Sequence, residues 1–272
     1  MRAILRLYRY INILSIDIVA GAIIGALFFG KMLQVEIKTF GLIALGLSVW
    51  IIYTTDHLRD AKKIRHQAST ERHRFHQKYF RALVWFLGLA IVLDAVAIFY
   101  IRRQVFEGGL MLLPMVALYL VVQQYLRFLK EFVIAVLYTC GVLLLSITIT
   151  SVDMTRMHYV IIFQFGLIAW INLILFSWFD YVYDERDEQN SFVIIIGERG
   201  TCAFVYLLFV LIFLLTLGLI LIAGLSVPVV ILFMMTATLF LIFLFRARLA
   251  RNDLYRMIGD AVFLFPLVYL IA

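Results

Sequence analysis

The chain has 272 residues, of which 65% are hydrophobic, and its mean hydropathy is +1.02. This composition excludes an ordinary soluble domain and is typical of a polytopic membrane protein. A net charge of +7 is also found in nucleic-acid-binding proteins, but here membrane orientation explains it better, so no nucleic-acid partner is expected.

Mostly apolar segments recur along the whole chain, each about 17 to 25 residues long and so able to cross a bilayer as a helix. In chain order they cover 10–30, 38–56, 80–101, 108–126, 131–151, 158–180, 200–223, 227–245 and 255–272. We therefore predict an all-α transmembrane bundle of nine helices, forming a single domain over residues 1–272. Cys140 and Cys202 both lie in apolar segments and are predicted to be free thiols.

The distribution of basic residues predicts the orientation. With the N-terminus in the cytoplasm, 19 of the 24 Lys and Arg residues fall on the cytoplasmic side and five on the other. Positive charges gather on the cytoplasmic side of membrane proteins, so we predict a cytoplasmic N-terminus and a C-terminus outside. We expect the membrane to be a bacterial inner membrane.

The loop between Arg59 and Arg81 is strongly basic. Two interpretations stay open: it anchors the chain at the lipid surface, or Arg72 or Arg74 binds a phosphate group. The histidines in this loop form no convincing metal set, and a surface role is expected for His73 and His76.

Two acidic clusters follow apolar segments on the predicted cytoplasmic side. The first contains Asp56 and Asp60, and the second contains Asp180, Asp184 and Asp187. A helix turns about 100° per residue, so Asp60 lies about 40° around the helix from Asp56, and Asp184 and Asp187 each lie within about 40° of Asp180. Like charges beside hydrocarbon repel and need a cation between them, and oxygen ligands suit a hard divalent ion that also binds phosphate. The alternative is that they are solvated helix ends.

Three further aspartates lie in or near apolar segments, where a carboxylate is costly and usually functional. They are Asp17, Asp94 and Asp260. We expect Asp94, in the middle of its segment, to face the bundle interior. Asp260 either serves the site or forms an ion pair with Arg256.

The acidic clusters resemble the two motifs of the UbiA superfamily of intramembrane prenyltransferases. The first motif, Asn-Asp-x-x-Asp-x-x-x-Asp, aligns with residues 52–60: Asp56 and Asp60 match, while Ile52 and Tyr53 replace the leading Asn-Asp. The second motif matches Asp180, Asp184 and Asp187, with Gly197 downstream. Lys130, ahead of Gly141, resembles the family lysine, and Thr70 to Phe75 loosely echo a Thr-x-x-Arg-Pro segment. The resemblance covers nearly the whole chain.

The resemblance implies a UbiA-like fold. It also implies a Mg²⁺-dependent transfer of an isoprenyl group from an isoprenyl diphosphate to a small aromatic or lipophilic acceptor. The active site is expected to face the cytoplasm, in a protein surrounded by membrane lipid. The implied metal ligands are Asp56, Asp60, Asp180, Asp184 and Asp187. Lys130 and Arg72 or Arg74 are expected to contact the diphosphate, so the implied catalytic set is Asp56, Asp60, Asp180, Asp184 and Lys130. Tyr181 and Tyr183 are the aromatic candidates for contacting the donor.

Two alternatives to prenyl transfer stay open at this stage. A terpene cyclase of the same superfamily ionises the same donor without an acceptor. A non-catalytic isoprenoid-phosphate binder or a transporter is also compatible with the incomplete first motif. The donor chain length, the acceptor and the oligomeric state are not determined by the sequence.

Overall fold

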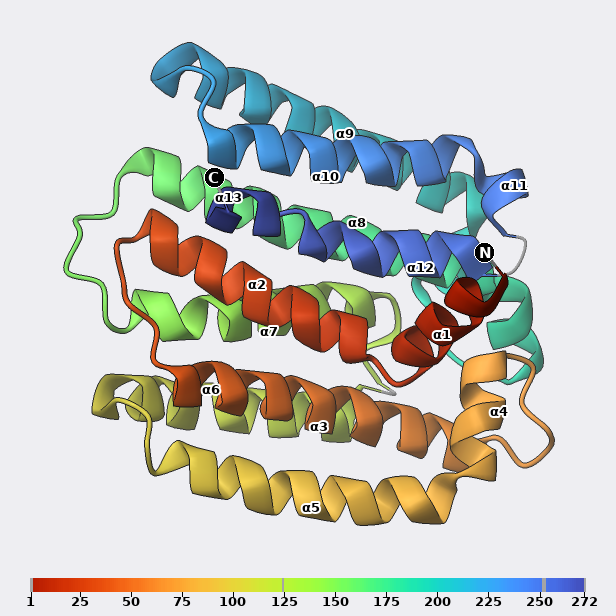
Figure 1. Ribbon diagram of the computed structural model, residues 1–272. Helices are drawn as coiled ribbons and strands as arrows, with labels where there is room; N and C mark the ends of the chain where they lie inside the picture. Colours follow the sequence, from red (N-terminus) through yellow and green to blue (C-terminus); the bar gives the residue numbers. More distant parts are fainter. Residues whose placement is uncertain (1, 124, 251–252, 272) are drawn as a thin grey trace.

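The computed structural model describes residues 2–123, 125–250 and 253–271, and every regular element in these ranges is a helix (Figure 1). The described ranges contain eight helices that are long and apolar enough to cross a membrane, or nine if a bent pair near the N-terminus counts as one span. This confirms the all-α membrane bundle. Gln124 and Ala272, which belong to predicted spans, and Arg251, which was counted among the cytoplasmic basic residues, lie outside the described residues.

The helices follow one another with short connections. In chain order they are α1 (Arg2–Ile13), α2 (Ile16–Met32), α3 (Thr39–Lys63), α4 (Glu71–Lys78), α5 (Phe80–Ile98), α6 (Arg103–Val122), the 3₁₀ helix η1 (Arg127–Leu129), α7 (Lys130–Ile147), α8 (Arg156–Arg186), α9 (Phe192–Ala223), α10 (Val227–Leu244), α11 (Arg246–Leu249), α12 (Leu254–Ala261), the 3₁₀ helix η3 (Val262–Leu264) and α13 (Leu267–Ile271).

The first predicted span is not one straight helix. Its two parts, Leu7–Ile13 and Ile16–Met32, are bent by 75°. The break is polar and buried: the Asn12 side chain donates to Asp17 over 2.6 Å, and Ser15 contacts His57 at 3.4 Å. Buried polar groups inside a membrane protein need such partners, and the bend brings them within reach.

Helix α8 forms the centre of the bundle and packs against α7, α9, α10 and α12. Its residues Phe165, Ile168 and Ile171 have no exposed surface. The outer helices α5 and α6 instead expose apolar side chains, as expected for surfaces in contact with lipid. Asp94 on α5 turns inward and accepts a hydrogen bond from Ser48 at 2.9 Å, so the predicted inward orientation is confirmed.

One end of the bundle collects the polar elements. The C-terminal ends of α3 and α8 and the N-terminal ends of α7 and α12 meet there, next to α1 and the short helix α4 (Figure 1). The acidic clusters end α3 and α8, so this arrangement brings both to one place.

Close packing of α2 in the bundle gives a test of the core. A Cβ atom added at Gly25 would lie 2.9 Å from Val142 Cγ1 and 3.4 Å from Phe165 Cζ, whereas one added at Gly88 meets nothing within 4 Å. Gly25→Ala should therefore lower stability, because overpacking costs about 1–3 kcal/mol and exceeds the up to about 1 kcal/mol that alanine gains in helix propensity.

The matched control is Gly88→Ala on the lipid-facing side of α5, which should be neutral or slightly stabilising. Thermal unfolding of both variants in one detergent measures the difference. Equal unfolding midpoints for the two variants would contradict the packing described here.

Candidate functional site

A cavity of about 460 Å³ opens into the bundle at its polar end. Along α8, its lining runs from Asp184 and Asp180 to Phe176, Leu173 and Ala169, which lie on successive turns. The cavity therefore passes from a charged mouth into an apolar depth. Such a shape accommodates a molecule with an anionic head and a hydrocarbon tail.

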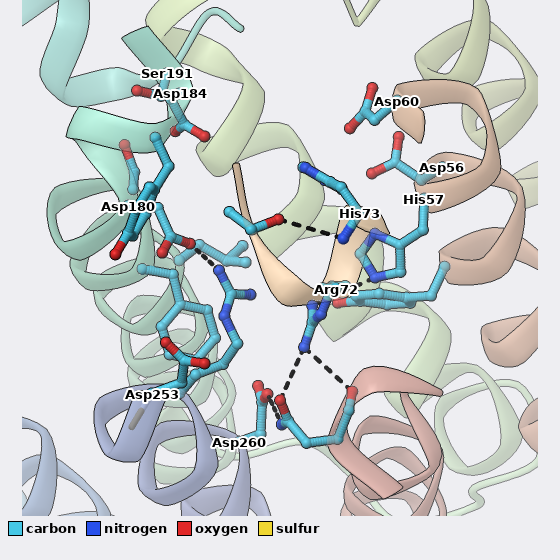
Figure 2. Close-up of a pocket in the computed structure, with 18 of the residues that line it drawn as sticks. Asp56, His57, Asp60, Arg72, His73, Asp180, Asp184, Ser191, Asp253 and Asp260 are labelled. Atoms are coloured by element: carbon cyan, nitrogen blue, oxygen red, sulfur yellow. Dashed lines mark hydrogen bonds and ion pairs between the residues drawn. The ribbon is translucent and has the colours of Figure 1, made fainter. Parts of the chain in front are cut away.

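The first acidic pair lines one wall of the cavity. Asp56 and Asp60 are one turn apart on α3 and face the same side, as the spacing predicts (Figure 2). Gln123 donates a hydrogen bond to Asp56 over 2.6 Å, and Lys130 Nζ lies 3.9 Å from an Asp60 oxygen. Tyr53, which replaces an aspartate of the family motif, also lines the cavity.

The second acidic pair, Asp180 and Asp184 of α8, lies on the opposite wall (Figure 2). Asp180 is held by two residues of α12: Tyr255 donates its hydroxyl to one carboxylate oxygen and Arg256 donates to the other. The alternative that Arg256 forms an ion pair with Asp260 is therefore wrong. Arg256 pairs with Asp180, and Asp260 accepts a hydrogen bond from the Asn12 side chain over 2.7 Å.

Two of the predicted site residues are not brought to the cavity. Asp187 ends α8 and accepts hydrogen bonds from the backbone N–H and the hydroxyl of Ser69, while His66 Nε2 lies 3.2 Å away. Burial would raise the pKa of Asp187, but these hydrogen bonds hold that pKa below its usual value. Tyr181 packs against the hydrophobic core, whereas Tyr183 lines the cavity.

Arg72 of α4 lies between the two acidic walls (Figure 2). Its guanidinium donates to the backbone and side-chain oxygens of Asn12 and approaches His57 Nε2 at 3.3 Å. In the described part of the chain, no carboxylate lies within 4 Å of it. Burial, and then the nearby Arg256, lowers the pKa of Arg72 to about 10. Arg72 is thus a cation in the cavity without a direct counter-ion.

Arg74, the other candidate of α4, plays a different part. Although it reaches the cavity lining, its guanidinium donates to the carbonyl oxygens of Ala68 and Ser69. It therefore stabilises the loop that precedes α4, and Arg72 is the better placed of the two for an anion.

The expected surface role for the α4 histidines is wrong for His76, which is 1% exposed, and His73 lines the cavity. Burial first of all lowers the pKa of both imidazoles to about 4. For His73, the neighbouring Arg72 adds to this effect. Both rings are therefore neutral at pH 7.

Glu131 and the pair Tyr255–Arg256 line the cavity but were not assigned to the site from the sequence. One Glu131 oxygen accepts from the backbone N–H of Phe192 at 2.8 Å, which fixes the start of α9. Glu131 directly follows the lysine that the motif comparison singled out, and that adjacency was the available signal. For Arg256 the signal was its place in the last of the five basic segments on the predicted cytoplasmic side, but membrane orientation alone explained that charge.

The site residues do not form a ready-made metal centre. Over the described ranges, no group of three His, Cys, Asp or Glu side chains is arranged to hold a metal ion. The carboxylates of Asp56, Asp60 and Asp184 nevertheless face one cavity and supply the oxygen ligands that Mg²⁺ prefers. Because Mg²⁺ is commonly held by one or two carboxylates together with phosphate oxygens, these residues fit an ion whose coordination a phosphate ligand completes.

The protein is thus an all-helical membrane protein with an amphiphilic cavity between two acidic walls. Sequence comparisons add nothing further: no family model matches, and neither does any curated protein sequence.

The fold has relatives among solved structures. A UbiA homologue from Archaeoglobus fulgidus bound to GPP and Mg²⁺ aligns with a TM-score of 0.68 and 13% identity over 97% of this chain and 99% of the other. An apo UbiA homologue from Aeropyrum pernix K1 aligns with a TM-score of 0.67 and 11% identity over 96% of each chain. A digeranylgeranylglyceryl phosphate synthase aligns with a TM-score of 0.57 and 14% identity over 96% of this chain and 97% of the other. The chain has the UbiA fold.

The buried histidines predict how stability depends on pH. An imidazole that titrates near 6.5 when unfolded and near 4 when folded binds fewer protons in the folded state between these values. The stabilising contribution of each neutral histidine to the free energy of unfolding is therefore fully present above pH 6.5. It falls as the pH drops towards 4, by up to about 1.4 kcal/mol per pH unit for each such histidine.

Replacing one of these groups should flatten this dependence. His76→Gln should lose less stability than the wild type between pH 7.5 and pH 5, measured by thermal unfolding in detergent. The control His158→Gln, three residues after the N-cap Thr155 of α8, should follow the wild type. A His76→Gln curve parallel to that of the wild type would contradict the assignment.

Proposed function

We propose that this integral membrane protein is a UbiA-type prenyltransferase. It transfers an isoprenyl group from an isoprenyl diphosphate to a small lipophilic or aromatic acceptor. The main support for this proposal is that two acidic walls face each other across one cavity, with Arg72 between them and an apolar lining deeper in the bundle. Solved structures of the same fold support it, since Archaeoglobus fulgidus homologues were obtained with DMAPP and Mg²⁺ and with GPP and Mg²⁺.

Asp56, Asp60 and Asp184 are the carboxylates that would hold Mg²⁺ at the mouth of the cavity. When bound, the ion neutralises the charge of the diphosphate and makes it a better leaving group. Arg72 on α4 and Lys130 on α7 contribute further positive charge from the protein side.

The reaction follows from this placement of charges. The bond between C1 of the isoprenyl group and the diphosphate oxygen breaks, and the diphosphate leaves with the electron pair. The acceptor then gives an electron pair to the allylic carbon and loses a proton. The apolar lining, which includes Leu173, Phe176 and Phe263, surrounds the hydrocarbon chain and keeps water from the cation.

We place the mouth of the cavity at the cytoplasmic face of a bacterial inner membrane, with the N-terminus inside and the C-terminus outside. The charge asymmetry of 19 to 5 supports this orientation. The basic loop before α5 then lies at the cytoplasmic surface, beside the mouth.

Turnover tests the proposed function. Purified protein with geranyl diphosphate and Mg²⁺ should release pyrophosphate when a lipophilic phenol is present and form the prenylated phenol, identified by mass spectrometry. Release without an acceptor, with a hydrocarbon product, would instead indicate a cyclase. Binding without any release would indicate a non-catalytic binder.

The same assay tests the ligand assignment. Asp184→Asn should reduce pyrophosphate release by about 10- to 100-fold, because one charged contact to the ion is lost. Asp56→Asn should cost less, since Ile52 and Tyr53 already replace two polar residues of that motif. The control Asp94→Asn changes a buried aspartate outside the cavity and should retain turnover. Equal losses for Asp56→Asn and Asp184→Asn would contradict the unequal roles.

Orientation is tested with single cysteines introduced after Cys140 and Cys202 are replaced by serine. In intact spheroplasts, an impermeant maleimide should label Glu36→Cys, in the connection between α2 and α3. It should label Arg65→Cys, beside α4, only after lysis. Both positions are exposed. The opposite pattern would invert the proposed topology.

A further inference from the structure

Arg256 stands apart from the other cations at the polar end of the bundle because it is bound to a carboxylate of the second acidic motif. Its guanidinium donates to Asp180, and the dashed line from Asp180 in Figure 2 marks this contact. Tyr255 takes the other oxygen of the same carboxylate. The side chains are largely buried, with 19% of Arg256 and 11% of Asp180 exposed.

These contacts leave Asp180 poorly suited to bind a metal ion. Both of its oxygens already accept hydrogen bonds, and an incoming cation would have to displace the guanidinium. Breaking a buried ion pair is strongly unfavourable, because one charge stays behind without a partner. Asp184, one turn along α8, has no ion pair with any described residue and stays accessible from the cavity.

Arg256 has capacity to bind an anion as well as Asp180. A guanidinium has five N–H donors, and Asp180 and the neighbouring Tyr255 hydroxyl cannot take up all of them, so donors remain for an anion. The Arg256 guanidinium carbon lies 4.6 Å from the centre of the Phe176 ring, and both side chains line the cavity. Arg72 faces the same cavity, so the two guanidinium groups repel each other. An anion bound between them would relieve this repulsion.

We propose that Arg256 is a built-in cation of the diphosphate site, positioned by Asp180 and Tyr255, and that it carries charge which a second divalent ion would otherwise supply. This rests on the proposed function. Asp180 then acts as a positioning residue for Arg256, and Mg²⁺ is left to Asp56, Asp60 and Asp184. Part of the affinity for an isoprenyl diphosphate is therefore independent of metal.

Isothermal titration of the full-length protein in detergent, with geranyl diphosphate as the probe, separates these roles. The wild type should bind with Mg²⁺, and should still bind measurably in EDTA. Arg256→Gln should weaken the binding in EDTA by about 10- to 100-fold, the range for loss of a hydrogen bond to a charged group. Arg256→Lys should recover part of it. Arg246→Gln is the matched control, because Arg246 pairs with Glu198 outside the cavity and should bind as the wild type does.

The aspartates distinguish positioning from metal ligation. Asp180→Asn should weaken binding by the same factor with Mg²⁺ and in EDTA, because it acts through Arg256. Asp184→Asn should weaken binding only with Mg²⁺. This comparison does not depend on Arg256→Gln folding.

Two results would overturn the proposal while leaving the proposed function intact. One is wild-type binding that requires Mg²⁺ entirely, and the other is an Asp180→Asn variant that weakens binding only with Mg²⁺. Absence of wild-type binding under both conditions would instead overturn the proposed function itself.

Discussion

Carboxylates buried at the end of a membrane bundle need cations or hydrogen-bond donors within reach, and the architecture of the polar end follows from this requirement. Lys130 approaches Asp60 from α7, and Arg256 reaches Asp180 from α12. Asn12, next to the bend between α1 and α2, donates to both Asp17 and Asp260. Each contact joins a different pair of helices, so the charges also hold the polar end together.

The same requirement explains why α4 folds back over the bundle. Arg9 of α1 bridges Glu71 at 2.8 Å and Asp253 at 2.7 Å, so it connects α4 with the start of α12. Ser69, just before α4, is tied to Asp187 at the end of α8. These contacts fix both sides of the short helix. They direct Arg72 into the cavity, where its charge is available to an anionic ligand, and they bury His76 beneath it.

Local periodicity explains which site residues were predictable. Asp56 and Asp60, like Asp180 and Asp184, are four residues apart within continuous helices, so the helical repeat places each pair on one face. The same argument fails for Asp187, which is the C-terminal cap of α8, with φ −89° and ψ 7°. The chain leaves the helix there, and the carboxylate turns to Ser69. Tyr181 follows Asp180 directly and so points about 100° away from it.

The sequence by itself determined the membrane class, the approximate helices, and the acidic pairs, because hydropathy and helical spacing are local properties of the chain. Only the tertiary structure decided which cation meets which carboxylate. Arg256 and Asp180 are 76 residues apart, and no periodic pattern connects them. Asp260 was an equally plausible partner on charge alone. The burial of the α4 histidines depends in the same way on contacts between distant segments, since a short polar helix carries no local signal of what will cover it.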